Sequence, residues 1–295
     1  MKTTATYAVM GITGQVGGAT AQALLKAGQN VRGIVRDKGR AAKWKSAGVE
    51  LAPGDYSNVE ALTAAFRGVD GLFVMLPADF APSRGHPEAR ARSLALREAI
   101  TAAMPPKVVA LSSIGAQRRT GLGLITNLHI LEEVFASLPV PTTFLRPGWF
   151  MENAVWDVDP AVKTGTIPSF LQPLDKAIPM VATSDVGRVA AESLQKMWSG
   201  RRIVELEGPR RYSPNDIAEA LSIALGRRIS AAPVPRDDWE SFFQSQGTPD
   251  PAPRIEMLDS FNSDWISFEG SPATHITGRI GLQSVIQTLV DQRGA

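Results

Sequence analysis

Cysteine is absent from this chain of 295 residues, and histidine occurs only three times. The lack of cysteine excludes disulfide frameworks, thiolate metal sites and cysteine nucleophiles. The histidines His86, His129 and His275 lie 43 and 146 residues apart, so they form no local metal-binding motif. Metal-dependent hydrolysis and thiol chemistry are therefore poor hypotheses for this protein.

Long hydrophobic runs and a strong charge of one sign are also missing. The N-terminal apolar run ends after four residues at Gly11, whereas a secretion signal has an apolar core of about 7–15 residues and a membrane span about 20. We expect a cytoplasmic protein that does not cross a membrane. With 31 basic and 29 acidic residues, the net charge of +2 gives no reason to expect nucleic-acid binding.

Composition predicts a globular protein, since 44% of the residues are hydrophobic and 20% charged. From residue 6 to 146, short apolar runs without polar alternation are separated by helical segments, which is typical of a doubly wound parallel α/β sheet. The expected strands are 7–10, 31–35, 49–51, 72–76, 108–111 and 142–145. The expected helices are 18–27, 41–47, 58–67, 88–103 and 127–136.

Helix-capping residues, and a change in the sequence pattern after Pro147, refine the expected order of elements. Ser57 with Glu60 predicts a capping box at the start of the third helix, and Ser213 with Pro214 predicts the start of a later one. After Pro147, proline and glycine become frequent, and residues 231–275 show weak periodicity. We therefore expect a nucleotide-binding domain over 1–150 and a smaller substrate lobe over 151–295, packed on the first domain and partly completing it.

The strongest motif is a glycine loop between the first strand and the first helix. Residues 11–17 read GITGQVG. In such a loop the first glycine, Gly11, permits a tight turn, Gly14 lets backbone N–H groups approach a pyrophosphate, and Gly17 lets the helix pack closely on the strand. The motif follows the first strand of a βαβ series, as a dinucleotide site requires, so it predicts nucleotide binding more strongly than a structural turn.

A basic stretch after the second strand favours NADP(H) over NAD(H). Arg36 stands 19 residues after Gly17, where an NAD-selective fold usually carries an acidic residue for the ribose hydroxyl. A guanidinium can instead grip a 2′-phosphate. Asp37 is a counter-signal, and a solvated basic helix face is the alternative. The bases of this stretch are Arg32, Arg36, Lys38, Arg40, Lys43 and Lys45.

The order of these and later motifs resembles the NmrA-like branch of the atypical short-chain dehydrogenases/reductases. Besides the glycine loop, similar segments are VRGIVRD at 31–37, GDY at 54–56, HILEE at 129–133 and TFLRPGWFMEN at 143–153, followed by landmarks at 182–190, 206–209 and 213–226. The resemblance spans roughly residues 6–226. It implies the strand order 3-2-1-4-5-6 with a seventh strand.

The same resemblance implies where NADP(H) binds, across the carboxyl ends of the strands. It assigns the pyrophosphate to Thr13, Gln15 and Val16, and the 2′-phosphate to Arg36. The remaining assignments run from adenine to nicotinamide: Asp55 and Tyr56 near adenine, Leu76 and Pro77 beneath the ribose, and Ser112 with Pro147, Gly148, Trp149 and Phe150 around the nicotinamide.

The tyrosine and lysine pair of most short-chain dehydrogenases is absent. Four residues after Tyr7, Tyr56 and Tyr212 stand Gly11, Glu60 and Asp216, so no tyrosine has the lysine that would lower its pKa. Carbonyl reduction by that pair is excluded, and sugar-nucleotide epimerisation is a poorly supported third hypothesis, because it needs the same pair. Where the family often keeps a lysine, this chain has Leu128.

Other side chains offer substitutes, each with a structural alternative. His129 is a candidate proton donor, or it packs on the sheet or bonds a backbone carbonyl. Ser112 is a candidate donor to a substrate oxygen, or a turn residue. His86 borders the substrate, or lies in a plain surface loop. Trp149, Phe150 and Trp156 line an aromatic pocket, or pack in the core. Glu132 and Glu133 are expected on a solvated helix face.

These observations favour an NADPH-dependent reductase of conjugated, electron-poor acceptors such as quinones, azo compounds, imines or enones. Quinoid and cationic dye acceptors need little proton transfer from the enzyme in the hydride step, so the missing pair is tolerable. The alternative is a redox sensor that binds NADP(H) and reports to a protein partner. The expected substrate is a small aromatic or conjugated molecule, and a homodimer is left open by analogy.

Overall fold

A parallel sheet of eight strands forms the centre of the computed structural model, which describes residues 4–37, 39–270 and 275–294. The strand order is β3-β2-β1-β4-β5-β6-β10-β12, and every neighbouring pair is parallel. This confirms the doubly wound α/β class, the order implied for the first six strands and the seventh strand, β10; the eighth strand was not expected. The bounds are β1 Thr6–Met10, β2 Asn30–Val35, β3 Glu50–Pro53, β4 Gly71–Val74, β5 Val108–Leu111, β6 Thr142–Pro147, β10 Arg201–Glu207 and β12 His275–Thr277.

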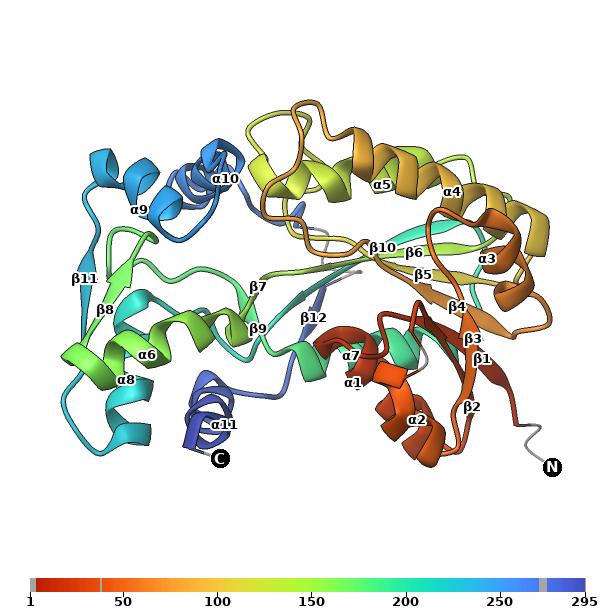
Figure 1. The fold of residues 1–295 in the computed structure, drawn as a ribbon, viewed down its shortest axis with the longest axis horizontal. Coiled ribbons are helices and arrows are strands. Elements are labelled where there is room, and N and C mark those ends of the chain that lie inside the picture. The colour runs from red at the N-terminus through yellow and green to blue at the C-terminus, as the bar shows by residue number, and fades with distance from the viewer. Residues whose placement is uncertain (1–3, 38, 271–274, 295) are drawn as a thin grey trace.

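Helices cover both faces of the sheet (Figure 1). One face carries α1 (Gln15–Lys26), α2 (Ala42–Ser46) and α7 (Thr183–Leu194), and the other carries α3 (Val59–Phe66), α4 (Pro87–Ala103) and α5 (Thr126–Phe135). Helices α1 and α7 approach closely because Gly187 lacks a side chain, since a Cβ there would lie 2.6 Å from the Thr20 nitrogen. Each face buries its own apolar cluster, as expected of a parallel sheet covered on both sides.

One of the two predicted helix caps is confirmed and the other is wrong. Helix α8 (Pro214–Leu225) begins after Ser213, with a capping box completed by Asp216, which confirms that start. The Ser57 cap is wrong: Asn58 caps α3, with its side-chain oxygen accepting from the Ala61 N–H at 2.8 Å. The reason is local, since the N–H and hydroxyl of Ser57 both donate to Asp55.

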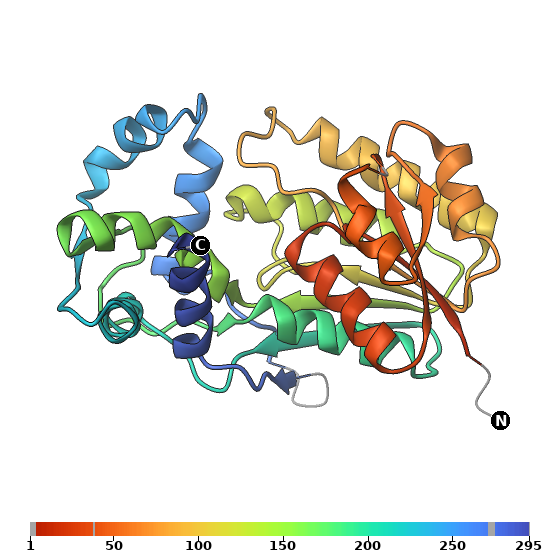
Figure 2. The same cartoon turned by 60° about the horizontal axis from the view of Figure 1, so that its bottom comes forward.

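The C-terminal part forms a lobe with a core of its own beside the carboxyl ends of the strands (Figures 1 and 2). In the described part of residues 231–275, where periodicity is weak, helices α9 and α10 pack through the aromatic contacts of Phe170 with Phe243 and of Trp149 with Phe261. The lobe's elements are α6 (Val155–Thr164), β8 (Thr166–Ser169), β11 (Ser230–Pro233), α8, α9 (Trp239–Ser245), α10 (Ala252–Asn262) and α11 (Leu282–Gly294).

Short elements complete the chain. Strands β7 (Trp149–Phe150) and β9 (Met180–Val181) pair beside the main sheet, and β8 pairs with β11. The 3-10 turns are η1 Gly39–Ala41, η2 Gly123–Ile125, η3 Met151–Ala154 and η4 Arg236–Asp238. Strands β10 and β12 come from beyond residue 150, so the sheet draws on both halves of the chain; a domain boundary at 150 stays a prediction. Over the described ranges, no helix is long and apolar enough to span a membrane.

Candidate functional site

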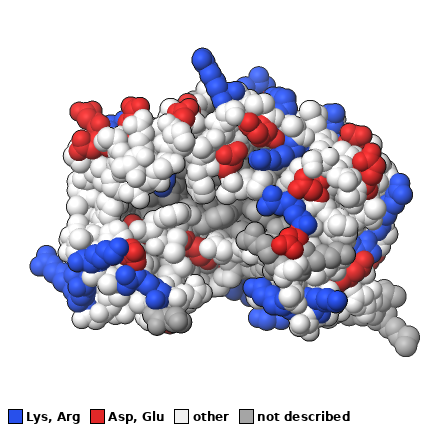
Figure 3. Space-filling view, in the orientation of Figure 1, with Lys and Arg blue, Asp and Glu red and all other residues white. Residues whose placement is uncertain are grey.

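The glycine loop lies at the carboxyl end of β1 and delivers the chain into α1. The Gly14 N–H donates to the Gly11 carbonyl at 2.9 Å, and Gly14 caps α1 without a side chain to bind the first N–H groups. The first turn of α1 contains no acidic residue. Figure 3 shows this face of the molecule hollowed at its centre, beside α1 and below α10. An anion in the hollow would meet free N–H donors and the positive end of the helix dipole.

The three glycines of the loop have different reasons to be glycine. At Gly17 a Cβ would meet the Gly11 carbonyl and lie 2.6 Å from the Met10 oxygen, so helix packing forbids it. Gly11 has a φ of +66°, and a Cβ there would lie 2.5 Å from the Met75 sulfur. At Gly14 a Cβ would meet only the Gly11 oxygen at 3.4 Å, and φ is −96°. Nothing inside the protein demands glycine at position 14, whereas a ligand approaching the backbone would.

The side chains assigned to the pyrophosphate surround this opening. Thr13 and Gln15 are exposed, while Val16 is buried under the helix. The dinucleotide fits these residues, because the loop offers backbone donors and small or polar side chains with no carboxylate against it.

The side chains of the basic stretch lie at different ends of the sheet. Arg36 is exposed immediately beyond the strand. Arg32 instead turns to the other end of the sheet: it donates to the carbonyls of Ala65 and Arg67 and pairs with Glu50 at 2.9 Å. The Asp37 carboxylate accepts the Gly39 N–H at 2.8 Å. Lys38 and the side chain of Arg40 lie outside the described residues.

Arg36 lies beside the loop that follows β3. Hydrogen bonds from Ser57 lower the pKa of Asp55, and the charges of Arg36 and Arg92 lower it further. Tyr56 is fixed, since its hydroxyl donates to the Met75 carbonyl at 2.6 Å and burial raises its pKa to about 12. The structure thus brings together the residues assigned to the adenosine end of the cofactor.

Beyond Met75, the segment after β4 leads away from the sheet. Leu76 is buried and Pro77 exposed. His86 precedes α4 with a φ of 55°, and its Nδ1 contacts the side-chain oxygen of the buried Asn127 at 2.7 Å. His86 therefore ties the loop after β4 to α5.

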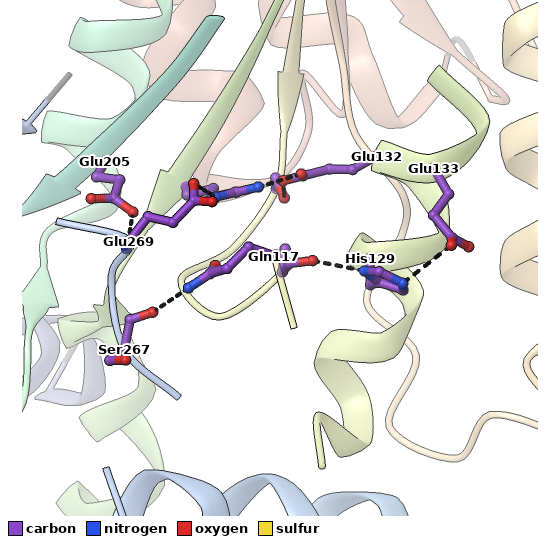
Figure 4. A network of polar contacts seen from close by, with 10 residues as sticks. Gln117, His129, Glu132, Glu133, Glu205, Ser267 and Glu269 are labelled. Atoms are coloured by element: carbon purple, nitrogen blue, oxygen red, sulfur yellow. Dashed lines mark hydrogen bonds and ion pairs between the residues drawn. The ribbon is translucent and has the colours of Figure 1, made fainter. Parts of the chain in front are cut away.

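A buried ion network lies at the carboxyl ends of β5, β6 and β10 (Figure 4). Arg146, 3% exposed, donates to both oxygens of Glu132, at 2.8 and 2.6 Å. The Ser112 hydroxyl donates to the same Glu132. The expectation of a solvated Glu132 is wrong, because only 11% of its side chain is exposed; Glu133, at 51%, is the solvated one.

The network continues into the segment after α10. Arg146 also donates to Glu269 at 2.7 Å, and the fully buried Glu205 accepts the N–H groups of Glu269 and Gly270. Sequence reasoning missed Arg146, Glu205 and Glu269. A signal was present, since Arg146 stands between Leu145 and Pro147, and Glu205 between Val204 and Leu206.

His129 lies next to this network on α5. Its Nδ1 donates to the Ala116 carbonyl at 2.8 Å, which fixes a proton on that nitrogen, and Nε2 lies 3.4 Å from Glu133. The side chain is 15% exposed. The backbone hydrogen bond considered for this residue is therefore present, and Nε2 is the nitrogen left for proton transfer.

Aromatic residues follow β6 at the nicotinamide end of the expected cofactor site. Gly148 lies so close to the Pro179 oxygen that a Cβ would stand 2.5 Å from it. Trp149 packs edge to face on Phe261, with ring centroids 5.3 Å apart, and Phe150 packs on the cluster beneath the sheet. Trp156 is 69% exposed on the first turn of α6. Within the described part of the chain, no three metal-ligating side chains gather.

Comparisons with known proteins find relatives over most of the chain. A model described as the NmrA-like family matches residues 3–262. The NAD(P)H azoreductase of Xenophilus azovorans is 26% identical, and quinone oxidoreductase 2 of Escherichia coli (strain K12) is 25% identical; each match covers 82% of this chain and 82% of the relative.

Solved structures agree in fold. The triphenylmethane reductase of Citrobacter sp. superposes with a TM-score of 0.80 at 22% identity, over 97% of this chain and 99% of that one. An NADPH-dependent quinone oxidoreductase from Escherichia coli, complexed with NADPH, gives a TM-score of 0.78 at 22% identity, over 96% and 99%. At these identities the likeness shows the fold alone.

Proposed function

The chain belongs to the NmrA-like family, and we propose that it is an NADPH-dependent reductase of conjugated, electron-poor acceptors: quinones, azo compounds, imines or enones. The observation that carries the proposal is Gly14, at the open N-terminus of α1. The protein has room for a Cβ at this position, so its own packing does not require glycine there. The curated relatives named as an azoreductase and a quinone oxidoreductase support the reaction class.

Residues of this chain bind and orient the cofactor. The α1 N-terminus, with Thr13 and Gln15, binds the pyrophosphate, and Arg36 beside Asp55 and Tyr56 binds the 2′-phosphate. When bound, NADPH supplies a hydride. Trp149 and Phe150 exclude water around the acceptor, and orientation provides most of the rate enhancement.

Proton supply is the second part of the proposal. A quinone that accepts a hydride becomes a hydroquinone anion and takes its proton from water, so no strong acid is needed in the protein. For azo and imine nitrogens, we propose that His129 Nε2 delivers the proton. The Ser112 hydroxyl donates its one hydrogen to Glu132, so its oxygen is left to accept a hydrogen bond. The carboxamide N–H of a nicotinamide is a donor of the kind that this oxygen requires.

A cytoplasmic location and a homodimer stay predictions.

The test is a fluorescence titration with NADPH and NADH on the wild type, Arg36→Ala and Lys45→Ala. Lys45, an exposed base of the same stretch, is the matched control. We expect NADPH to bind at least about tenfold more tightly than NADH, with this preference lost in Arg36→Ala and kept in Lys45→Ala. Failure of both nucleotides to bind would refute the site.

Turnover separates the reductase from the sensor. NADPH consumption is measured with a quinone, an azo compound and an enone. Oxidation of NADPH by at least one of them is expected. If NADPH binds with the Arg36-dependent preference and none of the acceptors is reduced, the reductase proposal fails in favour of the redox sensor, which binds the oxidised and reduced cofactor with different affinities.

A further inference from the structure

Arg254 is a half-buried cation without an anion. It lies on α10, and its guanidinium carbon stands 4.3 Å from the centroid of the Phe243 ring. Among the described residues, no carboxylate lies within 4.0 Å of its guanidinium, and no hydrogen bond satisfies it. Burial lowers the pKa of Arg254, and no neighbouring acid opposes that change. An arginine stays charged in a protein, so this arrangement leaves a charge partly desolvated and uncompensated.

Arg236, in the same aromatic cluster, is a cation whose charge is paired with a carboxylate. Its guanidinium carbon lies 4.9 Å from the centroid of the Trp239 ring, and its terminal nitrogen pairs with Asp259 at 2.8 Å. Stacking on an aromatic ring and pairing with a carboxylate are therefore compatible in this lobe. Arg254 has the first contact and lacks the second.

The position of Arg254 on α10 relates it to Trp149, at the nicotinamide end of the proposed site. Phe261 follows seven residues later, which places both side chains on one face of the helix, two turns apart. Phe261 packs on Trp149, directly after Gly148 at the carboxyl end of β6. An adjacent edge of α10 is covered by η2, where the Gly123 N–H donates to Glu256 at 3.1 Å. The hollow of Figure 3 lies below α10, the helix that carries both residues.

Resting on the proposed reductase function, we propose that Arg254 binds an acidic group of the acceptor. The substrate class is then a flat conjugated molecule carrying a sulfonate, carboxylate or phosphate. Two turns of helix separate Arg254 from Phe261, so the acidic group lies about 10 Å from the part of the acceptor that packs on Trp149. A guanidinium fork matches the paired oxygens of these anions.

The same residue rejects acceptors of the opposite charge. A cationic dye would bring a second positive charge into a partly dry site, where repulsion is weakly screened. Arg254 therefore sets an order of preference, with anionic acceptors above neutral ones and neutral ones above cationic ones.

The experiment compares para-sulfonated azobenzene with unsubstituted azobenzene, using the NADPH-loaded wild type, Arg254→Met and Arg236→Met. Methionine keeps the stem that packs on Phe243 and removes the charge. We expect kcat/KM for the sulfonated compound to exceed that for azobenzene by about tenfold or more in the wild type and in Arg236→Met. In Arg254→Met the ratio should fall to about one through a higher KM, with the affinity for NADPH unchanged.

Equal losses for both compounds, or an unchanged ratio, would overturn the proposal. If neither compound is reduced, equilibrium dialysis of both against the NADPH-loaded protein still decides it. Preferential binding of the sulfonate that disappears in Arg254→Met supports the anion site even where reduction fails, whereas equal binding by wild type and Arg254→Met refutes it. Thermal unfolding of each variant guards against a loss caused by misfolding.

Discussion

Arg146 and Glu132 form a bidentate ion pair beneath the carboxyl end of the sheet, with side chains 3% and 11% exposed. The pair joins β6 to α5, and through Glu269 and Glu205 it also fastens the segment after α10 to the sheet. Ser112, assigned to the nicotinamide end, donates to the same carboxylate. In the proposed site, the geometry around the nicotinamide end therefore depends on this ion pair.

Breaking the pair from one side should be costly. Arg146→Met leaves Glu132 buried without its cation, and we expect a loss of about 3–5 kcal/mol in the free energy of unfolding. Adding Glu132→Leu should recover part of that loss. Urea unfolding measures both. Lys163→Met, which breaks the exposed pair with Asp159, is the control and should cost less than about 1 kcal/mol. An Arg146→Met loss as small as the control's would contradict the assignment.

The two glycines Gly14 and Gly17 should separate binding from folding. In Gly14→Ala the added Cβ has room in the protein, so we expect unfolding within about 0.5 kcal/mol of wild type and a loss of at least about tenfold in NADPH affinity. Gly17→Ala drives a Cβ against the Gly11 carbonyl and should lower stability by about 2 kcal/mol or more. Thermal unfolding and fluorescence titration test the pair, and normal NADPH binding by Gly14→Ala would count against the site.

The effect of replacing His129 on kcat should depend on whether the acceptor needs a proton from the protein. His129→Asn retains a donor for the Ala116 carbonyl and removes Nε2. We expect kcat for an azo acceptor to fall by about 100-fold and kcat for a quinone to change by less than about threefold. Steady-state kinetics across pH 5–9 provide the test, with Glu133→Gln as a comparison at the neighbouring carboxylate. Equal losses with both acceptors would show that His129 only positions the loop.

Local patterns were enough to predict the sheet and the glycine loop, because each depends on neighbours in sequence. The strand order of the first six strands and β10 followed from the resemblance carried by motifs such as GITGQVG. Even the Ser57 error was local: the pattern fitted two caps one residue apart, and Asp55 decided between them by binding Ser57.

The ion network and Arg254 could not be located in this way. Glu132 and Arg146 are 14 residues apart, but Glu269 lies 123 residues beyond Arg146 and 64 beyond Glu205, so the network meets only when the sheet and the segment after α10 are assembled. Periodicity places Glu132 on a helix surface, and only the fold shows that β6 presents an arginine there. The aromatic helices α9 and α10 lack a clear apolar period, since α9 packs on Phe170 from the loop after β8 and α10 packs through Phe261 on Trp149.

Asp157 should make stability depend on pH in the direction opposite to most acids. On α6, burial raises the pKa of Asp157 to about 7 from 3.8. The folded protein therefore keeps a proton that the unfolded chain releases near pH 4, so this contribution is complete below about pH 4 and declines as pH rises to about 7. Asp157→Asn should be more stable than wild type by on the order of 2 kcal/mol at pH 8, and equal to it at pH 4.

Asp159→Asn is the control on the same helix, because hydrogen bonds from Arg293 and Lys163 lower the pKa of Asp159, and its contribution is lost as pH falls. Urea unfolding of the three proteins at pH 4, 6 and 8 tests this, and parallel profiles for wild type and Asp157→Asn would show that the carboxyl ionises freely in the folded state.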